Sequence, residues 1–153
     1  MKAAVQVADR RIEFCDVPTP SPGPGQVLVR SLQASICGSD QHVYKGEFAG
    51  RVKYPHIGGH EFAGVVEAVG QQVRGLSVGD RVVVDPLVWC GRCRACLEGH
   101  YSACRSLKLV GIDLPGGFAE YVCAEQDKCF KLPEEIGDEQ AALIELYSVG
   151  VHV

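Results

Sequence analysis

Four cysteines lie close together in the pattern C-x2-C-x2-C-x7-C: Cys90, Cys93, Cys96 and Cys104. Four thiolates at this spacing can surround one tetrahedral ion, and a closed shell of four sulfurs is typical of structural zinc. An iron–sulfur cluster is one alternative, but the ferredoxin-type run needs a three-residue last spacer followed by proline. Here seven residues intervene and Arg105 follows. Metal-free thiols are the other alternative, and the spacing favours zinc.

Three arginines accompany these cysteines: Arg92, Arg94 and Arg105. Four thiolates around a divalent zinc ion leave a net charge of about −2, which we expect these guanidinium groups to offset. One alternative is an ordinary solvated surface, and the other is a nucleic-acid-binding patch. The formal charge of −4 and the pI near 5.7 argue against it, because proteins that bind phosphate backbones are basic.

A second group of possible ligands is spread along the chain. Cys37 follows an expected strand, His60 and Glu61 precede another, and Glu145 lies in an expected helix near the C-terminus. Cysteine, histidine and carboxylate ligands from distant segments are typical of catalytic zinc, which keeps one position open for substrate. Singly, these residues are also ordinary as a buried thiol, a hydrogen-bonded loop histidine and surface carboxylates. Spacing alone does not decide between the two interpretations.

The elements that must position these residues are mainly β. The chain has 153 residues, enough for one domain with a hydrophobic core, and its 18 glycines and 8 prolines predict many turns. The expected strands are 3–7, 12–17, 26–34, 62–69, 81–84 and 118–123. Residues 18–25 read as an extended surface loop, and Asp138 as the N-cap of a helix over 139–144. Short strands separated by turns predict a barrel or sandwich.

The sequence contains neither a signal-peptide core nor a run of about 18 apolar residues. We therefore expect a cytoplasmic protein that makes no membrane contact. In a reducing compartment the cysteines are metal ligands or free thiols rather than disulfides. Three of them have no ligand-like neighbours and are predicted to be packing residues: Cys15, Cys123 and Cys129.

A longer pattern connects the second group to a known family. Residues 59–73 read G-H-E-x2-G-x5-G-x2-V, residues 37–40 read C-G-S-D, and residues 116–121 read G-G-F-A-E-Y. Together with the cysteine quartet and S-V-G-V-H at 148–152, these resemble, in order, the zinc-containing alcohol dehydrogenases of the medium-chain dehydrogenase/reductase family. The resemblance is closest to the sorbitol and threonine dehydrogenase branch, which has Glu at the position of Glu145.

The resemblance implies a mainly β fold, a GroES-like partly open β-barrel with a few short helices and a zinc-binding lobe at about 86–108. It divides the chain into a catalytic domain, 1–140, and the start of a helical connection, 141–153. In the family that connection leads to a dinucleotide-binding α/β domain. No G-x-G-x-x-G fingerprint occurs in this sequence, which ends within an apolar segment, so we expect an N-terminal catalytic fragment.

For the site, the resemblance implies a catalytic zinc held by Cys37, His60 and either Glu61 or Glu145, hence two zinc ions per chain. Ser39 and His42 match the residues that relay the substrate proton. The family has proline directly after this glutamate, whereas Leu146 stands here. Leucine permits a continuous helix, which leaves the direction of Glu145 open and favours Glu61 as the direct ligand.

For the activity, the resemblance implies that the full-length enzyme oxidises a secondary alcohol, polyol or sugar-acid-like, to a ketone with NAD or NADP. We expect its partner to be a small alcohol rather than a nucleic acid, the enzyme to be a homo-oligomer, and the isolated chain to be inactive. The alternative is a non-enzymatic, zinc-stabilised GroES-like binding module. Such a module needs the quartet but not the second site. The number of zinc ions bound per chain therefore distinguishes the enzyme, with two, from the module, with one.

Overall fold

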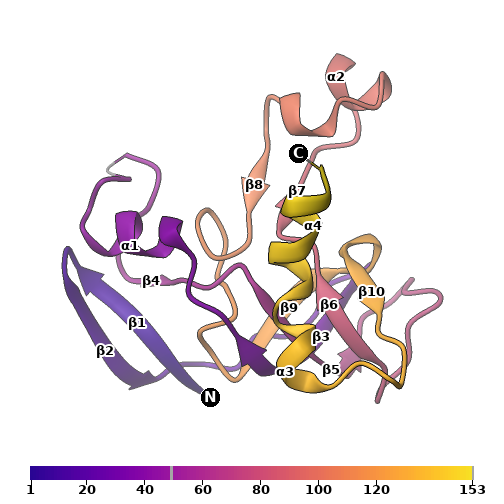
Figure 1. Cartoon of the computed structure of the whole chain (residues 1–153), viewed down its shortest axis with the longest axis horizontal. Coiled ribbons are helices and arrows are strands. Elements are labelled where there is room, and N and C mark those ends of the chain that lie inside the picture. Colours follow the sequence, from indigo (N-terminus) through magenta and orange to yellow (C-terminus); the bar gives the residue numbers. More distant parts are fainter. Residues whose placement is uncertain (49, 153) are drawn as a thin grey trace.

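The computed structural model describes residues 1–48 and 50–152 (Figure 1). Three antiparallel sheets make up the body of the molecule, with strand orders β2-β1-β4, β10-β6-β5-β3-β9 and β7-β8. The strands are β1 Lys2–Ala8, β2 Arg11–Asp16, β3 Gln26–Ala34, β4 His56–Ile57, β5 Phe62–Val69, β6 Arg81–Val84, β7 Leu87–Val88, β8 Lys108–Leu109, β9 Tyr121–Glu125 and β10 Cys129–Lys131. The helices are α1 Gly38–Tyr44, α2 Arg94–Leu97, α3 Asp138–Ala141 and α4 Ile144–His152, with 3₁₀ turns at Tyr101–Ala103 and Gln126–Lys128. The predicted mainly β fold with a few short helices is confirmed.

The core lies on one face of the five-stranded sheet. Alternate residues of a strand point to the same face, so β-branched side chains two residues apart on β3 and β6 are buried together. The largest fully buried side chains are Val27, Val29, Phe62, Val66, Val82 and Val84. Burying each contributes about 1.5–3 kcal/mol to folding relative to leaving it exposed.

Two glycines of the G-H-E-x2-G-x5-G pattern allow backbone segments to approach closely. A side chain at Gly64 on β5 would collide with the carbonyl oxygen of Arg30 on β3, its partner strand. At Gly70 it would collide with the carbonyl oxygen of Gly23, in the loop before β3. The spacing of these glycines therefore serves the pairing of β5 with β3, which places the start of β5 beside the end of β3.

The strands predicted over 3–7 and 12–17 pair as the β1–β2 hairpin, and those predicted over 26–34, 62–69 and 81–84 are confirmed as β3, β5 and β6. The strand predicted at 118–123 starts later, at Tyr121. The backbone N–H of Phe118 donates to the Gly58 carbonyl (3.0 Å), and its carbonyl accepts from Ala4 (2.8 Å). Phe118 therefore connects β1 to the loop before His60 instead of extending β9.

The predicted helix over 139–144 is wrong in its boundaries. Its N-cap is Gly137, not Asp138, because the Gly137 N–H donates to Oε1 of Gln140 (3.0 Å). Asp138 is already helical and accepts from the Arg81 guanidinium (2.7 Å). The helix also breaks at positions 142–143, where the Leu143 N–H bonds to the carbonyl of Gln140 (3.1 Å), three residues back. Two helices, α3 and α4, result.

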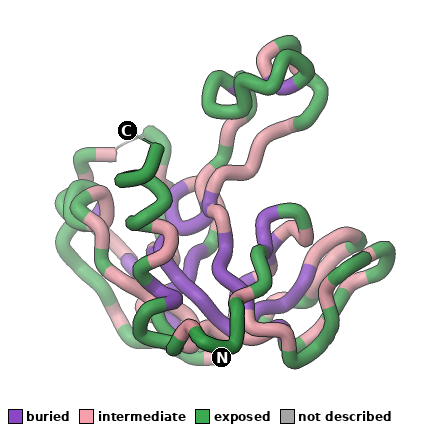
Figure 2. The backbone as a smooth tube through the Cα atoms, turned by 45° about the vertical axis from the view of Figure 1, so that its right-hand side comes forward, coloured by how far each residue is buried: buried purple, intermediate pink, exposed green. Residues whose placement is uncertain are grey.

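Residues 89–107 project from the body between β7 and β8, and we call them the cysteine lobe (Figure 2). At its base the Trp89 ring stacks on Tyr101 with centroids 4.3 Å apart. The Lys128 Nζ lies 2.5 Å from the centroid of the Trp89 ring and 3.6 Å from Asp85 Oδ2. Burial lowers the pKa of Lys128, and the Asp85 charge opposes this shift. A cation on an aromatic face thus joins the lobe to the body.

Helix α4 leaves a row of apolar side chains in water. None of its described residues is buried, and its large exposed side chains are Leu146, Tyr147, Val149 and Val151. By contrast, Ala141 and Ala142 just before it are buried. Among the residues that the structure describes, no helix is long and apolar enough to cross a bilayer.

We expect the 153-residue chain to self-associate through this face of α4, because covering each exposed leucine or valine contributes about 1.5–3 kcal/mol. Leu146→Asp and Val149→Asp should shift the chain toward monomer in sedimentation velocity. Ser148→Asp is the matched control, since it adds the same charge to an exposed position without removing an apolar side chain. A wild-type chain that stays monomeric at high concentration with α4 intact would contradict the prediction.

Candidate metal centres

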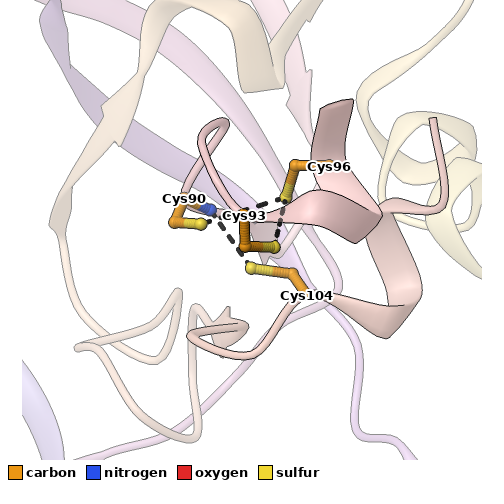
Figure 3. Close-up of side chains that lie close together, drawn as sticks. All are labelled: Cys90, Cys93, Cys96 and Cys104. Carbon is orange, nitrogen blue, oxygen red and sulfur yellow. Dashed lines mark hydrogen bonds between the residues drawn. The ribbon is translucent and has the colours of Figure 1, made fainter. Parts of the chain in front are cut away.

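The four cysteines of the quartet converge in the cysteine lobe (Figure 3). Cys90 follows β7, Cys93 precedes α2, Cys96 lies within it, and Cys104 follows the 3₁₀ turn. Their sulfur atoms all lie within 4.8 Å of one another, with 3.5 Å between Cys93 and Cys96 and 4.0 Å between Cys90 and Cys96. Zinc–sulfur bonds of about 2.3 Å in a tetrahedron require sulfurs about 3.8 Å apart. The geometry fits one tetrahedral zinc ion.

Backbone N–H groups supply positive charge around the quartet. N–H donors of Cys96 and Arg105 lower the pKa of the Cys93 thiol to about 6, so this ligand is largely ionised at neutral pH. Burial, followed by the hydrogen bond with Cys93, raises the pKa of Cys96 to about 12. A bound cation would offset the cost of ionising the buried Cys96 thiol.

Two further amides donate to one sulfur of the quartet. The N–H groups of Cys90 and Ser106 reach the Cys104 sulfur at 3.3 and 3.4 Å. Arg94, by contrast, pairs with Glu98 at 2.8 Å on the outer surface of the lobe. Backbone amides thus offset part of the negative charge of the sulfurs, a role that the sequence suggested for the arginine side chains.

A second group combines Cys37, His60 and Glu61, whose ligand atoms lie within 4.8 Å of one another. Cys37 is the N-cap of α1, just after β3, while His60 and Glu61 lead into β5. The last residue pair of the β3–β5 ladder is Ala34 and Phe62. The residues just beyond these strand ends therefore lie next to one another. His60 and Glu61 are buried, with 7% and 3% of their surface exposed, and Cys37 is half-buried.

Close packing of glycines fixes the loop that carries His60. Gly59 has φ of +90°, a left-handed conformation that disfavours side chains, and a Cβ there would collide with Phe118. Any side chain at Gly111 or Gly116 would in turn collide with the Gly59 backbone. The glycine directly before His60 is therefore required, because three backbone segments meet at Gly59.

A buried histidine supports the same loop. Burial lowers the pKa of His56, so its ring is neutral and its Nε2–H donates to the Gly111 carbonyl (2.9 Å). The Gly111 segment is also held from outside, where Arg51 makes two hydrogen bonds of 2.8 and 2.7 Å to Asp113. The approach of Gly111 to Gly59 is therefore fixed from both sides.

The His60 ring faces polar groups on both nitrogens. Its Nε2 lies 3.4 Å from the Ser39 hydroxyl and 4.0 Å from Glu61 Oε1. Its Nδ1 is buried without a hydrogen-bond partner and lies 3.7 Å from Asp40 Oδ1. A thiolate, an imidazole and a carboxylate form a donor set that zinc prefers, and three protein ligands leave a fourth position open. These residues fit an open zinc site.

Sequence reasoning gave Asp40 no role. Its Oδ2 accepts from the Cys37 backbone N–H (2.8 Å), while Oδ1 faces His60 Nδ1. One carboxylate thus accepts from the backbone of one candidate ligand and faces the ring of another, at a distance beyond a hydrogen bond. Its position three residues after the N-cap Cys37, where acidic capping residues are favoured, was the available signal.

Ser39 and His42 both lie on α1, three residues apart and hence on the same side of the helix. Ser39 faces the His60 ring, as described above. His42 is exposed and bonds through Nδ1 to the Glu47 carboxylate, and this hydrogen bond lowers the pKa of Glu47. The two relay residues thus lead from the group of Cys37, His60 and Glu61, which we call the open group, toward solvent. That they carry the substrate proton stays a prediction.

Glu145 lies near the open group but outside it. It is half-buried on α4, which runs continuously through Leu146 as predicted. Burial raises the pKa of Glu145, the charges of Glu61 and Asp85 add to the shift, and His60 opposes it. Its carboxylate therefore lies within electrostatic range of His60, whereas the compact group comprises Cys37, His60 and Glu61. That Glu145 binds zinc stays a prediction.

Comparisons with known proteins agree with this architecture. Residues 23–134 match the alcohol dehydrogenase GroES-like domain. The chain is 43% identical over 155 aligned residues to sorbitol dehydrogenase from Bacillus subtilis, covering 99% of this chain and 44% of that protein. It is also 43% identical to L-threonine 3-dehydrogenase from Deinococcus deserti, with 99% and 45% covered.

Among solved structures, a short chain alcohol dehydrogenase (rspB) from Escherichia coli CFT073, complexed with NADH, superposes with a TM-score of 0.93. The two sequences are 38% identical, and the alignment covers 100% of this chain and 44% of the other. The chain thus spans a little under half the length of the relatives it matches.

Proposed function

Because the chain belongs to the zinc-type alcohol dehydrogenases of the medium-chain dehydrogenase/reductase family and contains their GroES-like domain, we propose that it is the catalytic domain of an NAD(P)-dependent dehydrogenase. Its substrate is a secondary alcohol of the polyol or sugar-acid type, which is oxidised to a ketone. The similarity to sorbitol dehydrogenase supports a polyol, and the similarity to L-threonine 3-dehydrogenase supports a secondary alcohol more generally.

The convergence of Cys37, His60 and Glu61 beside the Ser39 hydroxyl carries the proposal. A module that only binds a partner needs the quartet, but it has no use for three ligand-type side chains gathered from the ends of β3 and β5. When bound there, zinc supplies Lewis acidity that lowers the pKa of an alcohol oxygen into the neutral range. Cys37, His60 and Glu61 would hold the ion, and Asp40 bonds to the Cys37 backbone while its carboxylate faces the His60 ring.

The proton of the alcohol leaves along α1 in this proposal. The Ser39 hydroxyl accepts it next to the His60 ring and passes it to His42. His42 is exposed and bonded to Glu47, so the imidazolium that forms is stabilised by a carboxylate and can release its proton to water. These residues therefore remove one proton without bulk water entering the buried part of the site.

The division of the chain follows from the same proposal. Residues 1–140 form the catalytic domain, with a structural zinc ion in the lobe at about 86–108. Residues 141–153 begin the connection to a dinucleotide-binding domain that holds the hydride acceptor, NAD or NADP. The apolar side chains of α4 are then the surface that such a domain covers.

Metal content tests the proposal directly. We expect two zinc ions per chain after dialysis against metal-free buffer, because both groups present complete donor sets. Cys37→Ala and His60→Ala should each reduce the content to one, measured by elemental analysis against protein concentration. Cys129→Ala is the control, since this buried cysteine lies in the hydrophobic core, outside both groups. One zinc ion per wild-type chain would favour the binding module instead.

A further inference from the structure

Ser35, the residue directly after β3, is joined to Glu61 by two hydrogen bonds. Its backbone N–H donates to the Glu61 carbonyl (2.9 Å), and its hydroxyl donates to Oε2 of the Glu61 carboxylate. Glu61 is buried, and a buried carboxylate requires hydrogen-bond donors or a cation. The two bonds fix both ends of this side chain, the backbone and the carboxylate.

The two carboxylate oxygens of Glu61 have different neighbours. Oε2 accepts from Ser35, whereas Oε1 points to the other side and lies 4.0 Å from His60 Nε2. A carboxylate can bind a metal through one oxygen or through both. With Oε2 engaged by the hydroxyl, Glu61 presents a single oxygen to the group.

Glu145 lacks such a restraint. Within the described part of the chain, no hydrogen bond or ion pair involves its side-chain carboxylate. It also lies on α4, none of whose described residues is buried. Of the two glutamates that could supply the carboxylate ligand, Glu61 is held by a hydrogen bond and Glu145, among the described residues, is not.

We propose that Ser35 is a positioning residue of the open metal site, whose hydroxyl makes Glu61 rather than Glu145 the carboxylate ligand, through Oε1 alone. This inference rests on the proposed function, because it requires a metal ion at Cys37, His60 and Glu61. Removing a hydrogen-bond partner of a metal-ligating side chain typically lowers metal affinity by about 10- to 100-fold.

The test uses the full 153-residue chain with one equivalent of Zn²⁺ in the quartet and Co²⁺ titrated into the open site against a competing chelator. Ser35→Ala should weaken Co²⁺ binding by about 10-fold or more and change the visible absorption of bound Co²⁺. Ser35→Thr keeps a hydroxyl and should restore binding. Ser31→Ala is the matched control, since Ser31 lies on the same strand and its hydroxyl bonds to the Gly117 carbonyl (3.3 Å) instead.

A double variant separates positioning from general destabilisation. In the Glu61→Gln background, Ser35→Ala should have little further effect on Co²⁺ affinity, because its hydroxyl acts through the Glu61 carboxylate. Glu145→Gln should weaken binding more in the Ser35→Ala chain than in the wild type, since Glu145 then supplies the missing oxygen. If Ser35→Ala weakens Co²⁺ binding equally in the wild-type and Glu61→Gln backgrounds, Ser35 acts on the fold alone and the proposal is wrong.

Two failures remain distinguishable. If the wild-type chain binds two metal ions and Ser35→Ala keeps full affinity and an unchanged Co²⁺ spectrum, the role of Ser35 is overturned while the proposed function stands. If the wild-type chain binds only one ion, both are overturned.

Discussion

Cys93→Ala should unfold the cysteine lobe and lower the free energy of unfolding of the whole chain by several kcal/mol. Structural zinc contributes about 10–16 kcal/mol of binding free energy in small zinc domains, and this is lost when the closed shell is broken. Apart from the stack at its base and short helical turns, the lobe has few buried contacts, because most of its residues are exposed. Hydrogen exchange should show residues 89–107 without protection.

Cys37→Ala should behave differently. It removes one ligand from a group that lies at the ends of β3 and β5, which are paired by a long antiparallel backbone ladder. We expect one zinc ion to be lost and the chemical denaturation midpoint to move only slightly. Cys15→Ala, at a half-buried cysteine on β2 outside both groups, is the control for removing a thiol. Equal destabilisation by Cys93→Ala and Cys37→Ala would contradict the division into a structural and an open site.

The second large effect concerns activity. We expect the zinc-loaded 153-residue chain to show no measurable reduction of NAD⁺ or NADP⁺ with sorbitol or threonine. Holding two reactants in place is worth effective concentrations of about 10⁵–10⁸ M, and this chain contains no fingerprint for binding the hydride acceptor. Absorbance at 340 nm measures the product, with the B. subtilis sorbitol dehydrogenase as positive control. Robust turnover by the chain would refute the division of domains proposed above.

How much of the fold the sequence predicts depends on the range of the interactions. Strands β3, β5 and β6 are predicted to the residue, because alternating valines and glycine turns are local signals. The predicted start of β9 is wrong because Phe118 bonds to Gly58 and Ala4, far away in the chain. Strands of two residues, such as β4 and β7, exist only through their partners and leave no pattern of their own.

The two metal groups differ in the same way. The quartet is predictable from spacing, since its ligands lie in one short segment. The open group needs the family resemblance, because the pairing of β3 with β5 brings Cys37 to His60 and Glu61. The contacts of Asp40 and Ser35 escape prediction for the same reason. A residue that orients a ligand is recognised only after the strand register is known.

The stack at the base of the cysteine lobe has an optical consequence. Trp89 is the only tryptophan of the chain, and it sits between Tyr101 of the lobe and the ammonium group of Lys128 on the body. Excitation at 295 nm therefore selects a single indole located where lobe and body meet. Emission from this indole changes when the lobe separates from Lys128, so the protein carries a built-in fluorescent reporter of lobe attachment that needs no dye or label.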